Sequence, residues 1–123
     1  MKAHRLLLVL IASAFFAPAG ACHAQTWPQK PIRLIVPFPP GGGNDLIGRM
    51  VAQELTKKLG QTVFVDNRAG ANGIIGTVAA AKSPADGYTL LFVPPPFTYA
   101  HLMTPDVTYD PLKDFRAVGR LVS

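Results

Sequence analysis

The feature of this sequence that most constrains its fold is an apolar, β-branched run followed by a glycine-rich break and an amphipathic segment. Ile32–Val36 lies between Pro31 and Pro37, and its length and composition predict one buried strand. The prolines and glycines of residues 39–44 then exclude regular structure. From Asp45 onward, apolar residues recur with the spacing of one helix face. A strand followed closely by a helix is therefore the first expectation.

The predicted helix has clear end signals. Asn44 or Asp45 can cap its first turn, and Lys57 and Lys58 suit the negative end of its dipole in the last turn. Gly60 stands where a left-handed residue commonly ends a helix. We therefore expect the helix to stop at Gly60.

The same pattern repeats along the chain. Residues 63–65 and 89–93 predict a second and a third strand, and residues 74–82 predict a second helix between them. Residues 117–122 predict a further strand. Alternating strands and helices with short connections imply an α/β fold, in which a parallel sheet with right-handed crossovers carries helices on its faces.

The chain opens with the pattern of a secretory signal peptide. Lys2 and Arg5 precede an apolar run over residues 6–12, and small residues follow that run. The apolar segment is too short for a membrane-spanning helix, which needs roughly 20 apolar residues. We expect cleavage after Ala24, so that residues 1–24 form the signal peptide and the remainder is exported.

A second cleavage position, after Ala21, would make Cys22 the mature amino terminus, where a lipid can be attached. Residues 19–21 lack the leucine usual before such a cysteine, so lipid anchoring is the lesser alternative. Cleavage after Ala24 removes the only cysteine, which excludes disulfides and thiolate sites from the mature chain.

Charge and residue types narrow the possible functions. Removing Lys2 and Arg5 leaves ten lysine and arginine residues against seven acidic ones, a net charge of +3 instead of +5. The cations are scattered, which argues against a nucleic-acid partner, although a weak positive field favours anionic solutes. His101 is the only histidine of the mature chain, so we predict no catalytic residues, no metal site and no cofactor.

Two glycine loops precede the two predicted helices. Gly41, Gly42 and Gly43 stand before the first helix, and Gly70 and Gly73 stand before the second. In open parallel sheets, ligands bind at the carboxyl ends of the strands, where helix amino termini direct free N–H groups outward. The loops together predict a site for one anionic group, either a carboxylate or a phosphate.

Other interpretations of these residues stay open. The glycines can simply form tight turns. Asp45 can bind a ligand hydroxyl or amine, or it can serve as the first-turn acid of its helix. Asn67 and Arg68 can orient the second loop or pair with an anion. The alternative function is an α/β enzyme or domain that binds a phosphorylated ligand, but Leu46 replaces the last glycine of a dinucleotide fingerprint.

Several ordered segments resemble one family of receptors. Residues 27–45 closely resemble the opening of the tripartite tricarboxylate transporter receptors, which are also called Bug proteins. Residues 59–61 with 63–73, residues 86–91 and residues 109–115 continue the resemblance in the same order. The resemblance covers nearly the whole mature chain.

The resemblance implies an α/β, parallel-sheet domain like those of type II periplasmic binding proteins. Such receptors have two domains around a cleft, so residues 25–123 would be the amino-terminal part of the first domain, in a truncated chain whose second domain is missing. The implied protein is a periplasmic, monomeric receptor and not an enzyme. It would capture a small carboxylate solute and deliver it to the membrane permease subunits of a tripartite tricarboxylate transporter, or report it to a sensor. A truncated, non-binding remnant is the alternative outcome, because a cleft needs both walls.

The loops that match the carboxylate-binding loops of this family supply most of the predicted ligand-binding residues. These are Pro40, Gly41, Gly42, Gly43, Asn44, Asp45, Ala69, Gly70, Ala71, Asn72, Gly73 and Ile74, together with Thr98. Family members often carry small polar residues after the third strand, whereas residues 94–97 are Pro-Pro-Pro-Phe here. This departure removes three backbone donors and points to a partly apolar or aromatic solute. Asn44 stands where Thr or Ser is common, a change that preserves capping.

Overall fold

The computed structural model of the chain describes residues 27–99, 102, 104 and 107–121. The predicted signal peptide, both cleavage positions, Cys22 and His101 lie outside the described residues. Within the described ranges, no helix has both the length and the apolar character that crossing a bilayer requires.

Strands and helices alternate along the chain, and two short 3-10 turns interrupt the pattern. In chain order, the elements are β1 (Ile32–Val36), α2 (Gly43–Leu59), β2 (Val63–Asn67), the 3-10 turn η1 (Ala71–Gly73), α3 (Ile74–Ala81), β3 (Thr89–Leu91) and the 3-10 turn η2 (Pro95–Thr98). All three predicted strands before residue 94 and both predicted helices are present. β2 is longer than expected, and β3 is shorter.

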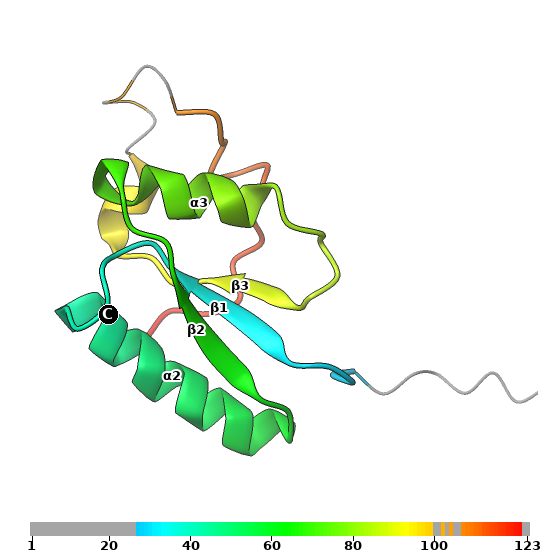
Figure 1. Cartoon of the computed structure of the whole chain (residues 1–123). Coiled ribbons are helices and arrows are strands. Elements are labelled where there is room, and N and C mark those ends of the chain that lie inside the picture. Colours follow the sequence, from blue (N-terminus) through cyan, green and yellow to red (C-terminus); the bar gives the residue numbers. More distant parts are fainter. Residues whose placement is uncertain (1–26, 100–101, 103, 105–106, 122–123) are drawn as a thin grey trace, which may run out of the picture.

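The sheet is parallel, with β1 as its central strand and the order β2-β1-β3. Ile32 of β1 lies beside Val63 of β2, and Arg33 of β1 lies beside Thr89 of β3. The helices α2 and α3 lie on opposite faces of the sheet (Figure 1). The predicted α/β fold with a parallel sheet is therefore confirmed.

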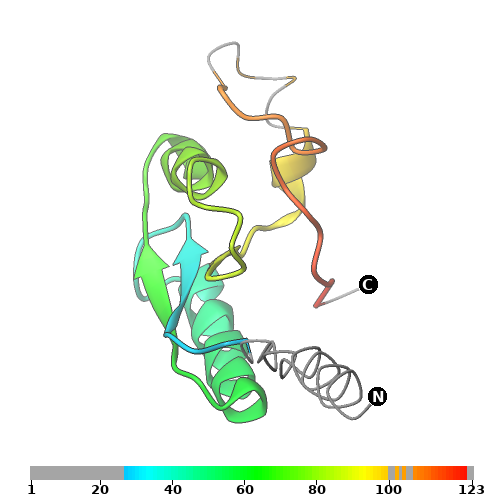
Figure 2. The same ribbon diagram turned by 90° about the vertical axis from the view of Figure 1, so that its right-hand side faces the viewer.

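One hydrophobic core fills the space between the sheet and α2. Ile32 and Leu34 of β1 are buried there with Ala52 of α2 and Val63 of β2. Side chains alternate between the two faces of a strand, so Arg33 points to the opposite face, on the side of α3. Figure 2 shows the strands enclosed between the two helices. Burial of β1 on both faces explains why its sequence is almost continuously apolar.

The ends of α2 partly follow the sequence signals. Gly60 has a φ of 67° and its N–H donates to the carbonyl oxygen of Thr56 at 3.1 Å, so the predicted stop is confirmed. The start differs, because the helix begins at Gly43 with Gly42 as N-cap and no side-chain cap. The predicted capping by Asn44 or Asp45 is therefore wrong, since both residues already lie inside the helix.

The predicted strand over residues 117–122 is wrong in its described part. Residues 117–121 form no strand, and Val118 is 85% exposed. A strand needs a neighbour to satisfy its backbone groups, and the three-stranded sheet places none beside this segment. The apolar run of this segment is therefore not sufficient to make it a strand.

Gly76 allows α3 to approach the loops at the carboxyl end of the sheet. A Cβ atom at this position would lie 2.6 Å from the Cβ of Pro37 and 2.7 Å from the carbonyl oxygen of Arg68. Pro37 follows β1 and Arg68 follows β2, so a single glycine holds the first turns of α3 against the ends of two strands. Because one of these contacts is backbone, the neighbours cannot simply rotate away.

We predict that Gly76→Ala destabilises the chain by about 1–3 kcal/mol, the usual cost of overpacking. The matched control is Gly43→Ala, where a Cβ would meet nothing within 4 Å, and that variant should stay within about 0.5 kcal/mol of the parent. The free energy of unfolding in urea, followed by circular dichroism, measures both. Equal stabilities for the two variants would contradict the close approach of α3.

Candidate functional site

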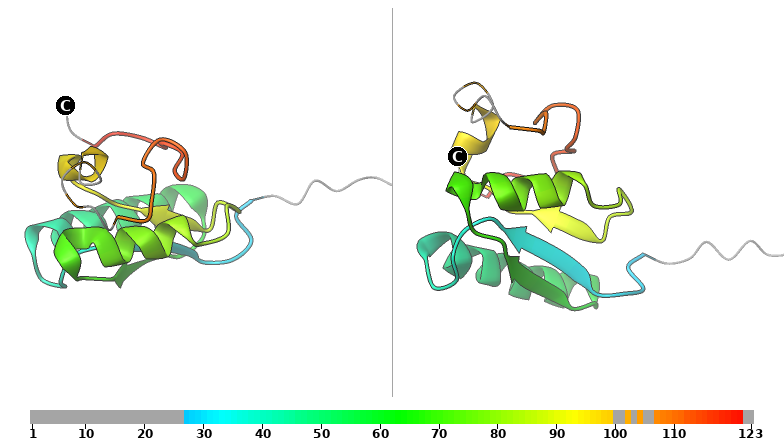
Figure 3. Two further views of the ribbon diagram at one scale, coloured as in Figure 1. Left: turned by 90° about the horizontal axis from the view of Figure 1, so that it is seen from above. Right: turned by 45° about the horizontal axis from the view of Figure 1, so that its top comes forward.

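The loops that follow the three strands lie at one edge of the sheet. Because β1, β2 and β3 are parallel, their carboxyl ends meet at the same edge. The first turns of α2 and α3 lie at this edge, on opposite faces of the sheet, in Figure 1 and in both views of Figure 3. The two predicted glycine loops are therefore on the same side of the molecule.

The carboxylate of Asp45 fixes the loop that follows β1. Asp45 is 4% exposed, and its Oδ2 accepts hydrogen bonds from the Gly41 N–H and from Nε of Arg49, each at 2.9 Å. Its Oδ1 accepts a hydrogen bond from Nδ2 of Asn67, also at 2.9 Å. We call Asp45, Arg49 and Asn67 the carboxylate bracket. It joins the first loop, α2 and the end of β2.

Asn67 gives the bracket a second hold on the first loop. Its Nδ2 also donates to the Phe38 carbonyl oxygen at 3.1 Å, and its Oδ1 accepts from Nη2 of Arg49 at 3.3 Å. The sequence had suggested that Asn67 orients the second loop, but the structure shows it orienting the first. Arg68, the other candidate, pairs with Asp66 at 2.8 Å.

The bracket holds Asp45 in its charged form. Hydrogen bonds from Arg49, from the Gly41 N–H and from Asn67, in that order of importance, lower the pKa of Asp45 from 3.8 to about 2, and desolvation opposes them. Asp45 lies in the first turn of α2, as the sequence suggested for a first-turn acid. Its carboxylate oxygens are occupied by internal donors, and its contact with a ligand stays a prediction.

The second loop has an unusual backbone. Four consecutive residues, Gly70, Ala71, Asn72 and Gly73, have positive φ angles of 131°, 46°, 52° and 92°. Left-handed conformations cost non-glycine residues on the order of 1–3 kcal/mol each and cluster at ligand sites. The turn is closed by the Gly73 N–H, which donates to the Gly70 carbonyl oxygen at 3.0 Å. Strain at Ala71 and Asn72 is thus held in place just before α3.

A small hollow lies where the three loops meet. Its volume is about 30 Å³, which is enough for a water-sized polar group. The lining residues come from the segments after all three strands and from α3. They are Pro37, Phe38, Asn72, Gly73, Thr77, Val93, Pro94 and Phe97.

The predicted site residues fall into different places around this edge. Asn72 and Gly73 line the hollow, whereas the segment from Pro40 to Gly43 is exposed at the start of α2. Ala69, Gly70 and Ala71 are exposed in the second loop, Ile74 begins α3, and Thr98 ends η2. The sequence singled out Pro94 and Phe97 for their effect on the solute, but it did not point to Pro37, Phe38, Thr77 or Val93. Several of them directly follow β1 or lie just beyond β3, and that position at a strand end is the signal that could have found them.

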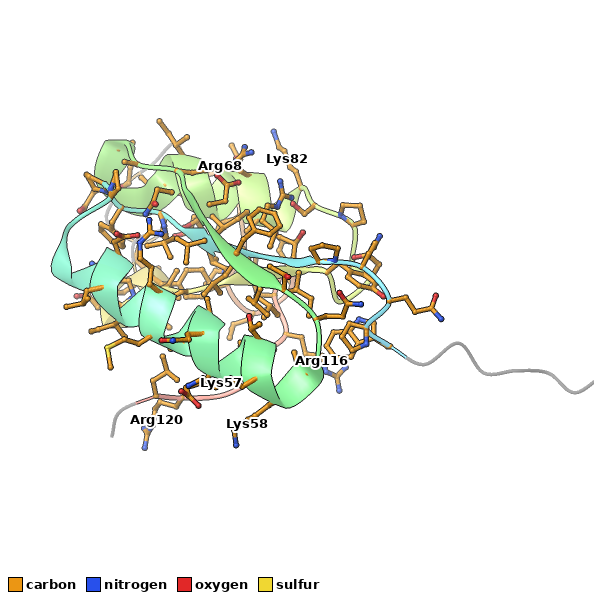
Figure 4. The ribbon with its side chains drawn as sticks, turned by 60° about the horizontal axis from the view of Figure 1, so that its bottom comes forward. Lys57, Lys58, Arg68, Lys82, Arg116 and Arg120 are labelled. Atoms are coloured by element: carbon orange, nitrogen blue, oxygen red, sulfur yellow. The ribbon has the colours of Figure 1, made fainter. Side chains whose placement is uncertain are left out.

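Cationic side chains do not gather at this edge. None of the residues that line the hollow is a lysine or an arginine. In Figure 4 the labelled cations lie in two groups, one with Arg68 and Lys82 and the other with Lys57, Lys58, Arg116 and Arg120. An anion here would therefore depend on backbone N–H groups and helix dipoles rather than on paired cations. No group of three or more His, Cys, Asp or Glu that could hold a metal ion occurs among the described residues.

Comparison with known sequences identifies relatives of this chain. The family described as "Tripartite tricarboxylate transporter family receptor" matches residues 47–123. Protein BugT of Bordetella pertussis is 47% identical over 124 residues, which cover 97% of this chain and 37% of BugT. The chain thus spans little more than a third of the length of that relative.

Solved structures of similar proteins share the fold. MatC from Rhodopseudomonas palustris, with bound malate, has 33% sequence identity and a TM-score of 0.67, covering 72% of this chain and 31% of MatC. A second R. palustris protein, solved with adipate, has 38% identity and a TM-score of 0.66, covering 70% of this chain and 29% of that protein. The likeness to periplasmic binding proteins that the sequence implied is confirmed for the part of the fold present here.

We predict that the carboxylate bracket makes stability depend on pH in the acid range. A carboxyl group whose pKa is lower in the folded chain stabilises that chain above its unfolded pKa, and the stabilisation is lost as the pH falls towards the folded value. For Asp45 this window runs from 3.8 down to about 2. Urea unfolding between pH 2 and pH 7 should therefore show a steeper acid loss for the parent than for Asp45→Asn.

Glu54→Gln is the control for this experiment. Glu54 pairs with Lys57 on the same helix, but both side chains are 60% exposed, so solvent screens the pair. The control variant should retain most of the acid dependence. If Asp45→Asn kept the parent's full loss of stability in acid while Glu54→Gln did not, the carboxylate bracket would not be the source of that loss.

Proposed function

This chain belongs to the tripartite tricarboxylate transporter receptor family, and we propose that it binds a small carboxylate at the edge where its strands end. The carboxylate is held by backbone N–H groups in the first turns of α2 and α3. The chain contributes one wall of the binding cleft. Its role is capture of the solute and not its chemical conversion.

The observation that carries this proposal is the uncapped start of α2, at the edge of the sheet where α3 also begins. At the start of α3, the Ile74 N–H already donates to the Ala71 carbonyl oxygen. Neither Gly42, at the start of α2, nor Gly73, at the start of α3, provides a side-chain cap. The first N–H groups of a helix have no carbonyl partner within it, so they need an external acceptor. The first hydrogen bond of α2 runs from the Leu46 N–H to the Gly42 carbonyl oxygen. The N–H groups of Gly43, Asn44 and Asp45 come before it and therefore have no partner within the helix. A carboxylate supplies such an acceptor together with favourable charge.

The bracket and the comparisons support the same function. Asp45 fixes the first loop from within, which prearranges the start of α2 and spares a ligand the entropy of ordering it. MatC was solved with malate, and another similar structure was solved with adipate. Both ligands are carboxylates, and both proteins share this part of the fold.

We propose the same organisation for the whole protein. Residues 1–24 are a signal peptide, and residues 25–123 are the amino-terminal part of the first of two domains. The protein acts in the periplasm as a monomer and passes its solute to the permease subunits of a tripartite tricarboxylate transporter or to a sensor. The family description supports the link to this type of transporter.

We predict that Gly42→Asp weakens carboxylate binding while the chain stays folded. Gly42 has extended angles, φ −79° and ψ 170°, which aspartate adopts readily at an N-cap. Its carboxylate would occupy the N–H groups of the first turn and repel an anionic ligand. Binding of malate, measured by isothermal titration calorimetry, should weaken at least about ten-fold, which equals about 1.4 kcal/mol.

Gly42→Ala is the matched control, because it adds the same Cβ without a charge. The built Cβ meets only the Pro39 carbonyl oxygen, at an ordinary 3.6 Å. This variant should bind malate as the parent does, and circular dichroism should show that both variants are folded. Tight binding of a nucleotide by the parent, with no binding of malate, adipate or benzoate, would instead favour a site for phosphorylated ligands.

A further inference from the structure

Arg33 is a charged residue in an otherwise apolar strand. It is the one residue of β1 that is not buried, and the other four are apolar. Its Nε atom is nevertheless buried, and it has no hydrogen-bond partner in the described part of the chain. A buried donor without a partner lowers stability, because it has left water and found no acceptor. Stability alone therefore does not account for an arginine at this position.

The guanidinium of Arg33 joins the end of α3 to all three strands. Its Nη2 donates to Oγ of Ser83 at 3.0 Å and to Oγ1 of Thr89 on β3 at 3.3 Å, and its Nη1 lies 3.9 Å from Oδ2 of Asp66 on β2. Ser83 follows α3, and its hydroxyl donates to the carbonyl oxygen of Ala79 in the last turn at 2.8 Å. A positive charge also suits the carboxyl end of a helix. Arg33 thus holds the end of α3 against the sheet.

Removal of Arg33 would leave its main partners paired. Asp66 also accepts a hydrogen bond from Nε of Arg68 at 2.8 Å, and the Ser83 hydroxyl keeps its bond to Ala79. Breaking a buried ion pair is costly mainly when the other charge is left without a partner. An apolar side chain of similar length at position 33 should therefore not lower the stability of the chain.

The helix α3 is held at both of its ends. At its start, Gly76 lets it pack directly on the segments that follow β1 and β2, and at its end it is bound to Arg33 through Ser83. The helix has 8 residues, which makes a rigid segment of about 12 Å. The second loop, with left-handed angles at Ala71 and Asn72, leads directly into it. A strained turn persists only where the surrounding structure fixes it, so this loop depends on the position of α3.

We propose that Arg33 is a positioning residue for the binding site, which fixes α3 along the sheet and thereby holds the second loop in its strained conformation. Arg33 lies near the amino end of β1, whereas the loop lies at the carboxyl edge of the sheet. Arg33 therefore acts through α3 and does not touch a ligand. This inference rests on the proposed function, because it gives the loop that leads into α3 a place in that site.

The test is Arg33→Met, followed by urea unfolding and by amide hydrogen exchange in NMR spectra. The urea midpoint should stay at or above that of the parent. The Gly73 N–H, which donates to the Gly70 carbonyl oxygen within the second loop, should exchange at least ten-fold faster. The Arg68 N–H, which donates to the Val36 carbonyl oxygen at the end of β1, should exchange no faster than in the parent. A residue that only stabilised the fold would lower the midpoint and speed both amides alike.

Ser83→Ala removes the same contact from the side of α3 and should give the same change at Gly73. Because both substitutions break one interaction, the double variant should exchange no faster than the single ones. Lys30→Met is the matched control, since Lys30 is another cation close to β1 but pairs with Asp86, with its own side chain 60% exposed. That variant should leave exchange at Gly73 unchanged.

Malate binding, measured by isothermal titration calorimetry, connects the loop to the site. Arg33→Met should weaken it at least ten-fold, although the variant is as stable as the parent. The inference would be overturned by an unchanged malate affinity, by Gly73 exchange within two-fold of the parent's rate, or by a lowered urea midpoint. A parent that binds neither malate nor adipate would overturn the proposed function, and the exchange rates would still show whether Arg33 positions the loop.

Discussion

The site depends on one buried carboxylate. Asp45 accepts hydrogen bonds from the Gly41 N–H, from Arg49 and from Asn67, so a loop, a helix and the end of a neighbouring strand are tied to one group. A buried charge is tolerated only when donors surround it, and here the donors come from three elements that must be correctly placed at once. The fold therefore positions the start of α2 through Asp45, and Asp45 stays ionised because the fold supplies its partners.

This arrangement leaves the neighbouring N–H groups available for an anion from outside. The internal carboxylate takes the Gly41 N–H, whereas the first turn of α2 begins at Gly43 without a side-chain cap. In the second loop, left-handed angles at Ala71 and Asn72 set the entry into α3, which lacks a side-chain cap but whose Ile74 N–H donates to the Ala71 carbonyl oxygen. Strain in that loop is retained because Gly76 lets α3 pack directly on Pro37 and on the Arg68 backbone. Apart from Arg49, which pairs with Asp45, backbone groups rather than lysine or arginine side chains thus form the charge environment of the site.

Local sequence signals predicted most of the fold but only part of the site. The apolar run of β1, the helical spacing after Asp45 and the stop at Gly60 are encoded by neighbouring residues, and all three are confirmed. Asn67 could not be predicted as a partner of Asp45, because it lies 22 residues away and meets Asp45 only when β2 pairs with β1. The packing of Phe97 on Tyr109 and Phe115 also depends on tertiary structure. Residues 117–121 show that a local signal can also mislead, since this β-prone run has no neighbouring strand and stays irregular.

The most direct test of the central claim is a crystal structure of the chain with a bound carboxylate. The account predicts that the carboxylate oxygens lie within hydrogen-bond distance of backbone N–H groups in the first turns of α2 and α3. It also predicts that the carboxylate of Asp45 still contacts Gly41 and Asn67 rather than the ligand. A carboxylate bound at another face, or at this edge only through lysine or arginine side chains, would contradict it.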